Sequence, residues 1–480
     1  MATAMAMAMA PPVGARSISA AISVCSRVSA FSASWDGFRI HSPWVSGVRG
    51  RCNLRVQRGF VSRARVTSKL EVAAPAPGSL YEGPITYDRL MPCPDYSLPP
   101  RVEHLLIEKN GNIVDIICEE LSLPPLYVAD LIRFGAVFYA LECPTPPPSA
   151  TPEQLELYNR VLKLRSSRKQ ERLSLKGKTL REAQKVHRIT TPSEYVESET
   201  YLRVHVHPKR FPRVYEVDWK SRIIAETDAF VVVDKPAGVS VGGTVDNLEE
   251  MCATHVSRAL KLKKPLILTH QIDTCTEGCV VFAKTKAFSS HFHMLLRERK
   301  VKKEYTALAA APVTPGHHIH YMRSDRYAPR IISNYEHPDW SNCELKILGC
   351  KQVKWPSAAV LSQYRVARCG WEHGEHAYEC SVSLLTGRTH QIRAQFAALD
   401  APLVGDSVYM TGVVARMKAP EIDPFLTASS IGDDESFNIV VENWRNQHGL
   451  EPVCALGLQA SVISWEGEKQ VFRAGRPWWR

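Results

Sequence analysis

The chain has 480 residues, of which 45% are hydrophobic and 23% charged, and it carries a formal net charge of +11. This length suits two or three globular domains with room for a real core, and these fractions are ordinary for soluble proteins. The uninterrupted apolar runs are too short to cross a bilayer, which excludes a membrane-spanning protein.

Thirteen cysteines are scattered along the chain without a C-x-x-C pair. An odd, dispersed set predicts reduced thiols, not a disulfide framework or a zinc ribbon. Neighbouring histidines are the other candidate metal ligands, and they occur at His205/His207, His291/His293 and His317/His318/His320. No Cys or acid completes a ligand set beside them, so we expect no metal and no cofactor.

Most of the positive charge lies at the front of the chain, where residues 1–70 contain ten Arg or Lys residues and one acid. The segment is rich in Ala and Ser, and its first cation, Arg16, follows an apolar Ala/Met stretch. A secretory signal has the reverse order, whereas this composition is typical of an organelle transit peptide. Abundant Ser favours a chloroplast over a mitochondrion; a tail without an address is the plain alternative.

Residues 71–100 are rich in Pro and Gly, as in a linker. Beyond them, apolar residues at helical spacing predict two helices between residues 113 and 132, with Gly135 as a stop and a strand at 136–139. This order resembles the small S4-like RNA-binding module, in which Arg133 would be the RNA-contacting cation of the second helix. A plain helical hairpin is the alternative.

A Pro-rich interruption at 143–153 leads into a charged stretch, 163–188, with ten cations against two acids. Its pattern predicts a helix, and such a run is usually a solvated face. Beside an RNA-binding hairpin it is equally suited to phosphates. Residues 200–212 alternate like a strand, so we assign 101–215 to an S4-like α/β module with a basic insert.

From residue 216 the chain alternates short strands with helices. Apolar runs predict strands at 231–233, 280–283 and 303–309. Helical spacing predicts two helices, with apolar faces formed by Phe288, Phe292 and Leu295 in one and by Ile392, Phe396 and Leu399 in the other.

Asp273 lies alone in a polar loop of the segment HQIDTCTEGCVVFAKT (270–285), just before one of these strands. Three further segments share a pattern with it: ETDAFVVVDKPAGVSV, KKEYTALA, and LLTGRTHQIRAQFAALDAPLVGDSVY with LGLQASVISW behind it. Together they resemble the RluA-type RNA pseudouridine synthases over roughly residues 220–465, and plant organellar members best. The run Thr-Gly-Arg-Thr-His-Gln-Ile-Arg is the most specific part.

The resemblance implies an α+β domain over 216–480 with a mixed, mainly antiparallel central sheet and flanking helices, the pseudouridine synthase fold. It also implies an isomerase that converts uridines to pseudouridine in RNA, and we expect a monomer with RNA as its partner. A hydrolysing glycosidase needs two carboxylates, whereas an isomerase that returns the same base needs one. Asp273 is implied to be that acid; a loop Asp capping a turn is the alternative.

The resemblance implies two partners for Asp273. Tyr305 would stack on the target base and serve as a base in the sugar chemistry, unless it is an ordinary strand aromatic. Arg393 would pair with Asp273, because a guanidinium holds a partly buried carboxylate ionised.

The uridine must leave the base stack to react, at a cost of a few kcal/mol. RNA contacts are expected from Arg388 and His390, and from Lys235 in its Lys-Pro-Ala-Gly turn. The basic run 297–304 is also suited to phosphates, although surface lysines are the alternative. Gln271 would contact RNA near the flipped base, where the family favours Arg.

Two departures from the family pattern leave other functions open. Gln271 replaces an Arg, and Glu277 replaces a Ser and would disturb Asp273 if it pointed inward. A silent RNA-binding or ribosome-assembly factor on the same fold is therefore one alternative. A glycosidase using Asp273 with Asp406, which would release free uracil, is another.

Overall fold

The computed structural model describes residues 86–90, 101–148, 150–167, 173–323, 329–369, 374–410 and 454–480. The predicted transit peptide, nearly all of the predicted linker and the segment 411–453 lie outside these ranges. The described residues belong to one compact unit, Leu80–Arg480.

A small α/β module forms the first part of this unit. Its four-stranded sheet has the order β1-β6-β3-β4 with antiparallel pairings, and β2 pairs with β5 in a separate ribbon. The elements are β1 (Val102–Leu106), β2 (Gly111–Asn112), α1 (Ile113–Leu121), α2 (Pro125–Phe134), β3 (Val137–Ala140), β4 (His187–Ile189), β5 (Tyr195–Val196) and β6 (Tyr201–His205).

The predicted pair of helices and the strand after them are confirmed, and local signals explain their ends. The side chain of Asn112 accepts a hydrogen bond from the Val114 amide at 2.9 Å, which caps α1. Pro125 occupies the first turn of α2, where its missing N–H costs nothing. Gly135 ends α2 at φ 85°, a left-handed conformation that favours glycine.

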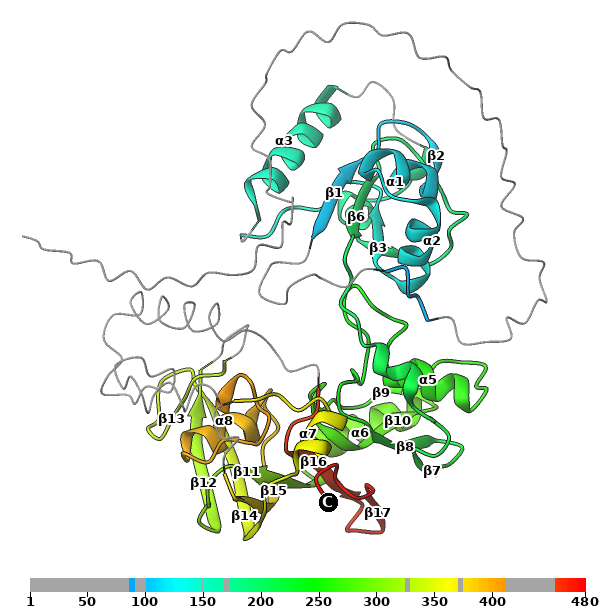
Figure 1. The fold of residues 1–480 in the computed structure, drawn as a ribbon. Coiled ribbons are helices and arrows are strands. Elements are labelled where there is room, and N and C mark those ends of the chain that lie inside the picture. The colour runs from blue at the N-terminus through cyan, green and yellow to red at the C-terminus, as the bar shows by residue number, and fades with distance from the viewer. Residues whose placement is uncertain are drawn as a thin grey trace, which may run out of the picture. The chain divides into compact units, whose positions relative to one another are not determined.

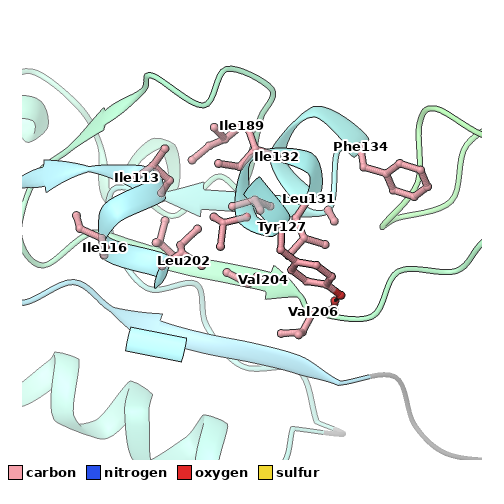
Figure 2. Packing of buried hydrophobic residues seen from close by; sticks show 14 of the residues in the cluster. Ile113, Ile116, Tyr127, Leu131, Ile132, Phe134, Ile189, Leu202, Val204 and Val206 are labelled. Atoms are coloured by element: carbon pink, nitrogen blue, oxygen red, sulfur yellow. Dashed lines mark hydrogen bonds between the residues drawn. The ribbon is translucent and has the colours of Figure 1, made fainter. Parts of the chain in front are cut away.

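The core of this module lies between the two helices and the sheet, as Figure 2 shows. Ile113 and Ile116 come from α1 and Leu131 from α2, and they meet Leu202 and Val204 of β6. Burying each such side chain contributes about 1.5–3 kcal/mol. The helical periodicity of the sequence thus selects the face that packs.

The prediction of one charged helix over 163–188 is wrong. The helix lies earlier, as α3 (Pro152–Ser167), and the described residues after it form a 3-10 turn, η1 (Leu173–Leu175), and a single helical turn, α4 (Leu180–Ala183). Gly177, at φ 73°, separates the two turns. Thr179 then restarts the helix through a reciprocal capping box with Glu182.

The second part is built on an eleven-stranded sheet with the path β13-β12-β14-β15-β11-β16-β10-β8-β7, which can be followed in Figure 1; β9 and β17 pair with β10 and β16. Only β10 and β16 run parallel among the described pairings, so the predicted mixed, mainly antiparallel sheet is confirmed. Its strands are β7 (Ile223–Glu226), β8 (Phe230–Lys235), β9 (Ile267–Leu268), β10 (Glu277–Ala283), β11 (Lys302–Ala309), β12 (Gly316–Met322), β13 (Ile332–Ser333), β14 (Ser341–Lys354), β15 (His376–Leu384), β16 (Leu458–Trp465) and β17 (Gln470–Arg473).

Helices flank this sheet: a 3-10 turn η2 (Pro212–Glu216), α5 (Cys252–Ala259), α6 (Lys286–Arg297), α7 (Ala358–Gln363) and α8 (Gln391–Ala398). Ile392 and Phe396 of α8 pack on the central strands, as their spacing predicts. At Gly278 the backbones of β10 and β16 approach each other so closely that a Cβ would lie 2.3 Å from the Ala460 carbonyl oxygen. Gly278, which follows the loop of Asp273, therefore permits the parallel pairing of β10 with β16.

Candidate active site

A cleft of about 870 Å³ is lined by the loop before β10, by β11 and by the first turn of α8. Asp273, Tyr305 and Arg393 all line it, although they are far apart in the sequence. The three residues that the sequence singles out for chemistry therefore share one cavity.

Asp273 lies in the loop between β9 and β10, where the Thr276 amide donates to its backbone carbonyl at 3.1 Å and closes a turn. Its side chain remains 23% exposed, so a substrate can reach the carboxylate. The Nη1 atom of Arg393 lies 3.8 Å from its Oδ2. The predicted ion pair is thus present at the long end of the range.

Arg393 makes its tighter contact with Asp406. Its Nε and Nη2 donate to the two carboxylate oxygens of Asp406 at 2.7 and 2.9 Å, and both side chains are fully buried. The Asp406 carboxylate also accepts from the amides of Val408 and Tyr409. This two-pronged pair fixes the guanidinium plane, so that its third nitrogen faces Asp273.

Tyr305 is 7% exposed on β11, opposite Val382 of β15. Burial, and then the nearby charge of Asp273, raise the pKa of its hydroxyl above the ordinary range. The ring is therefore a neutral apolar wall beside Asp273. This favours stacking against a base over a standing phenolate.

The side chain of Lys235 is directed into the protein interior, which corrects the prediction that it holds a phosphate. Its side chain is fully buried, and its ammonium donates to the carbonyls of Pro236, Val239 and Thr274 at 2.8–3.1 Å. Burial lowers its pKa to about 8. Since Thr274 follows Asp273, Lys235 ties the loop of Asp273 to the neighbouring turn.

The other expected RNA contacts divide into exposed and inward-facing residues. Gln271 and Arg388 are exposed and line the cleft. His390 is only 9% exposed, and its Nδ1 lies 3.2 Å from the Tyr409 hydroxyl. His390 also has φ 57°, so it begins α8 in a left-handed conformation. It also lines the cleft, so its contact with RNA stays a prediction.

Glu277 is directed toward Gln459 and Trp478 and does not pair with Asp273. Its Oε1 accepts hydrogen bonds from the Trp478 amide at 3.0 Å and from Gln459 Nε2 at 3.4 Å. Burial, partly offset by the Trp478 hydrogen bond, raises the pKa of Glu277 to about 7. The replacement of Ser by Glu therefore anchors the C-terminal segment to the start of β10.

Replacing Glu277 by Gln should make the protein more stable above pH 7 and leave it unchanged near pH 4.5. In the wild-type protein the carboxyl of Glu277 ionises more readily in the unfolded state than in the folded state. The free energy of unfolding therefore falls as pH rises from about 4.5 to the folded pKa of about 7. At 1.36 kcal/mol per pKa unit the gain above pH 7 is up to about 3 kcal/mol. Urea unfolding at pH 5 and pH 8 measures it; an equal difference at both would contradict this account.

Within the part of the chain that the structure describes, no cluster of His, Cys, Asp and Glu could hold a metal ion. Over the same residues, no helix combines the length and the apolar character needed to cross a membrane.

The family model for RNA pseudouridylate synthase matches residues 229–398, the range that contains Asp273, Tyr305 and Arg393. Two curated relatives share 52–53% of their aligned residues with this chain over at least 82% of its length. The chain belongs to the RNA pseudouridine synthases of the RluA type.

Those two relatives are chloroplast proteins by name. RNA pseudouridine synthase 6, chloroplastic, of Arabidopsis thaliana is 53% identical over 82% of this chain and 84% of its own length. The protein of the same name in Oryza sativa subsp. japonica is 52% identical over 90% of each chain. The dual-specificity synthase RluA of Escherichia coli (strain K12) is 27% identical over 42% of this chain and 81% of its own.

Sequence reasoning missed the principal partner of Arg393. Asp406 was considered only as a second acid for hydrolysis, although it stands in the Gly-Asp-x-x-Tyr run that follows the Arg motif. A buried ion pair needs both members close together, and the short sequence distance between Arg393 and Asp406 is the signal that could indicate the pair.

Proposed function

We propose that Asp273 starts the isomerisation of a flipped-out uridine in RNA, with Tyr305 against the base and Arg393 behind the acid. The observation that carries this is the shared cleft, in which a 23% exposed carboxylate lies 3.8 Å from a fully buried guanidinium. A carboxylate that is reachable from the cleft and oriented by a neighbouring guanidinium is suited to act as a nucleophile or base.

The reaction needs no second acid. The bond between N1 of the uracil and C1′ of the sugar breaks, the base turns, and C5 bonds to C1′. The C5 hydrogen leaves as a proton and N1, freed from the sugar, gains one, so neither water nor an oxidant is consumed. Asp273 acts on the sugar or base, and the neutral Tyr305 ring supports the base while it turns.

Asp406 is unsuited to the hydrolytic alternative. A general base must reach a water molecule on the far side of the sugar. The Asp406 carboxylate is fully buried, and both of its oxygens are held by Arg393. It is therefore a structural acid.

An assay with RNA labelled with tritium at uridine C5 tests the function. The wild-type protein should release tritium to water and leave pseudouridine in the strand. Free uracil would indicate a glycosidase instead. Tight binding without tritium release, across RNA pools from plastids, would favour a silent binding factor.

We further propose that residues 101–215 form an S4-like RNA-binding module and that 216–480 form the catalytic domain. Arg133 supports this, since it stands in the last turn of α2 with its side chain 46% exposed and 3.5 Å from Asp130. Arg133→Gln should weaken RNA binding several-fold and leave kcat unchanged. It should also reduce the slope of log Kd against log salt concentration by about one. An unchanged Kd would contradict the assignment.

A plastid location is the third part of the proposal. The two relatives above are named chloroplastic, and residues 1–70 have the composition of a transit peptide. Fusing residues 1–75 to a fluorescent protein should direct it to chloroplasts in plant cells. Accumulation in mitochondria would support the alternative address.

A further inference from the structure

Two neighbouring lysines of β11 differ in their surroundings. Lys302 also lines the cleft, but it is 64% exposed and its ammonium lies 2.5 Å from the carboxylate of Glu468. Lys303 is half-buried and lines the same cleft as Asp273 and Tyr305. Because side chains alternate along a strand, Lys303 and Tyr305 are directed to one face of the sheet.

The ammonium of Lys303 lacks a counter-charge within the described residues. Burial lowers its pKa to about 8, and no carboxylate offsets this. By contrast, the buried Arg393 is held by Asp406. A charge partly removed from water without a partner destabilises the folded protein, and an anion beside Lys303 would offset that cost.

We propose that Lys303 is the phosphate-binding residue of this cleft and contacts a phosphate next to the target uridine. This inference rests on the proposed function, which places the uridine between Asp273 and Tyr305. Residues two apart on a strand are about 7 Å apart. A base stacked on Tyr305 therefore leaves Lys303 beside the nucleotide, where its backbone must pass.

A phosphate suits this position better than a uracil carbonyl. An anion compensates the desolvated ammonium by charge, and a charge-assisted hydrogen bond is roughly twice as strong as a neutral one. Gln271 adds no charge to the cleft, while Arg388 and Arg299 are exposed cations at its wall. Lys303 is thus the cation placed closest in sequence to the stacking residue.

The test compares Lys303→Gln, Lys303→Arg and the matched control Lys302→Gln, all in an Asp273→Asn background that prevents turnover. The Kd for a uridine-containing RNA is measured between 50 and 300 mM salt. Lys303→Gln should weaken binding about tenfold and lower the salt slope by about one ion. Lys303→Arg should restore most of both. Lys302→Gln should weaken binding far less than Lys303→Gln, because Glu468 already pairs with that ammonium.

The melting temperature gives a second readout, which should rise where RNA affinity falls. Lys303→Met removes an unpaired, half-buried charge, so the melting temperature of the RNA-free protein should rise while RNA binding weakens. A merely structural lysine would give the reverse, a lower melting temperature with the salt slope intact, and would overturn the proposal.

Two other outcomes also overturn it. Unchanged Kd and salt slope with a lower kcat, measured with Asp273 restored, would assign Lys303 to the base or to proton transfer. An equal loss in Lys302→Gln would show diffuse surface charge. Failure of the proposed function itself is separate, since it would appear as activity retained by Asp273→Asn alone.

Discussion

Replacing Asp273 by Asn should abolish pseudouridine formation, by on the order of 10⁴-fold or more, while RNA binding survives. The amide has the size of the carboxylate but cannot act as a nucleophile or accept the proton. The fold should persist, because the tight partner of Arg393 is Asp406 and remains in place. Tritium release from C5-labelled RNA measures the activity, and a binding titration measures Kd.

Asp228→Asn is the matched control for this variant. Asp228 is an exposed acid in the turn between β7 and β8, and it does not line the cleft. Its replacement should leave both rate and Kd unchanged. Retained activity in Asp273→Asn, with a normal melting temperature, would show that another residue carries the chemistry.

Replacing Asp406 by Ala should destabilise the protein by about 3–5 kcal/mol. Arg393 has no exposed side-chain area, so the change leaves a guanidinium buried without its two-pronged partner. It also removes the acceptor for the amides of Val408 and Tyr409. Chemical unfolding of Asp406→Ala and of the wild-type protein measures the difference in the free energy of unfolding.

The double variant Arg393→Met with Asp406→Leu should lose far less stability than Asp406→Ala, because neither charge is then left buried. It should still be inactive, since Asp273 has lost the cation behind it. If the double variant were as unstable as the single one, the loss would come from packing or from the amides at 408–409, and not from an uncompensated charge.

Local patterns predicted most of the catalytic domain. The apolar run before residue 233 is β8, the run after Gly278 is β10, and the helical spacing of Ile392 and Phe396 is α8. Each of these signals depends on residues close together in the chain. The failed helix over 163–188 is the exception, where Gly177 interrupts a composition that otherwise favours a helix.

The surroundings of Lys235 and His390 differ from those that the sequence suggests for a common reason. A lysine in a Pro-Gly turn is usually exposed, yet Lys235 is buried because three carbonyls from two segments converge on it. His390 turns inward because Tyr409, beyond the helix, offers a hydroxyl. Both outcomes depend on segments brought together by folding, which no local pattern encodes.

The sequence by itself determined which family the chain joins, several of the strands and helices, among them β8, β10 and α8, and which acid stands alone before β10. Only the tertiary structure decided how these residues are used: that Asp406 holds Arg393, that Lys235 ties down a loop, and that Lys303 is left unpaired in the cleft. Hydrophobic periodicity is a local property, whereas the partner and the burial of a charge depend on which distant segments meet.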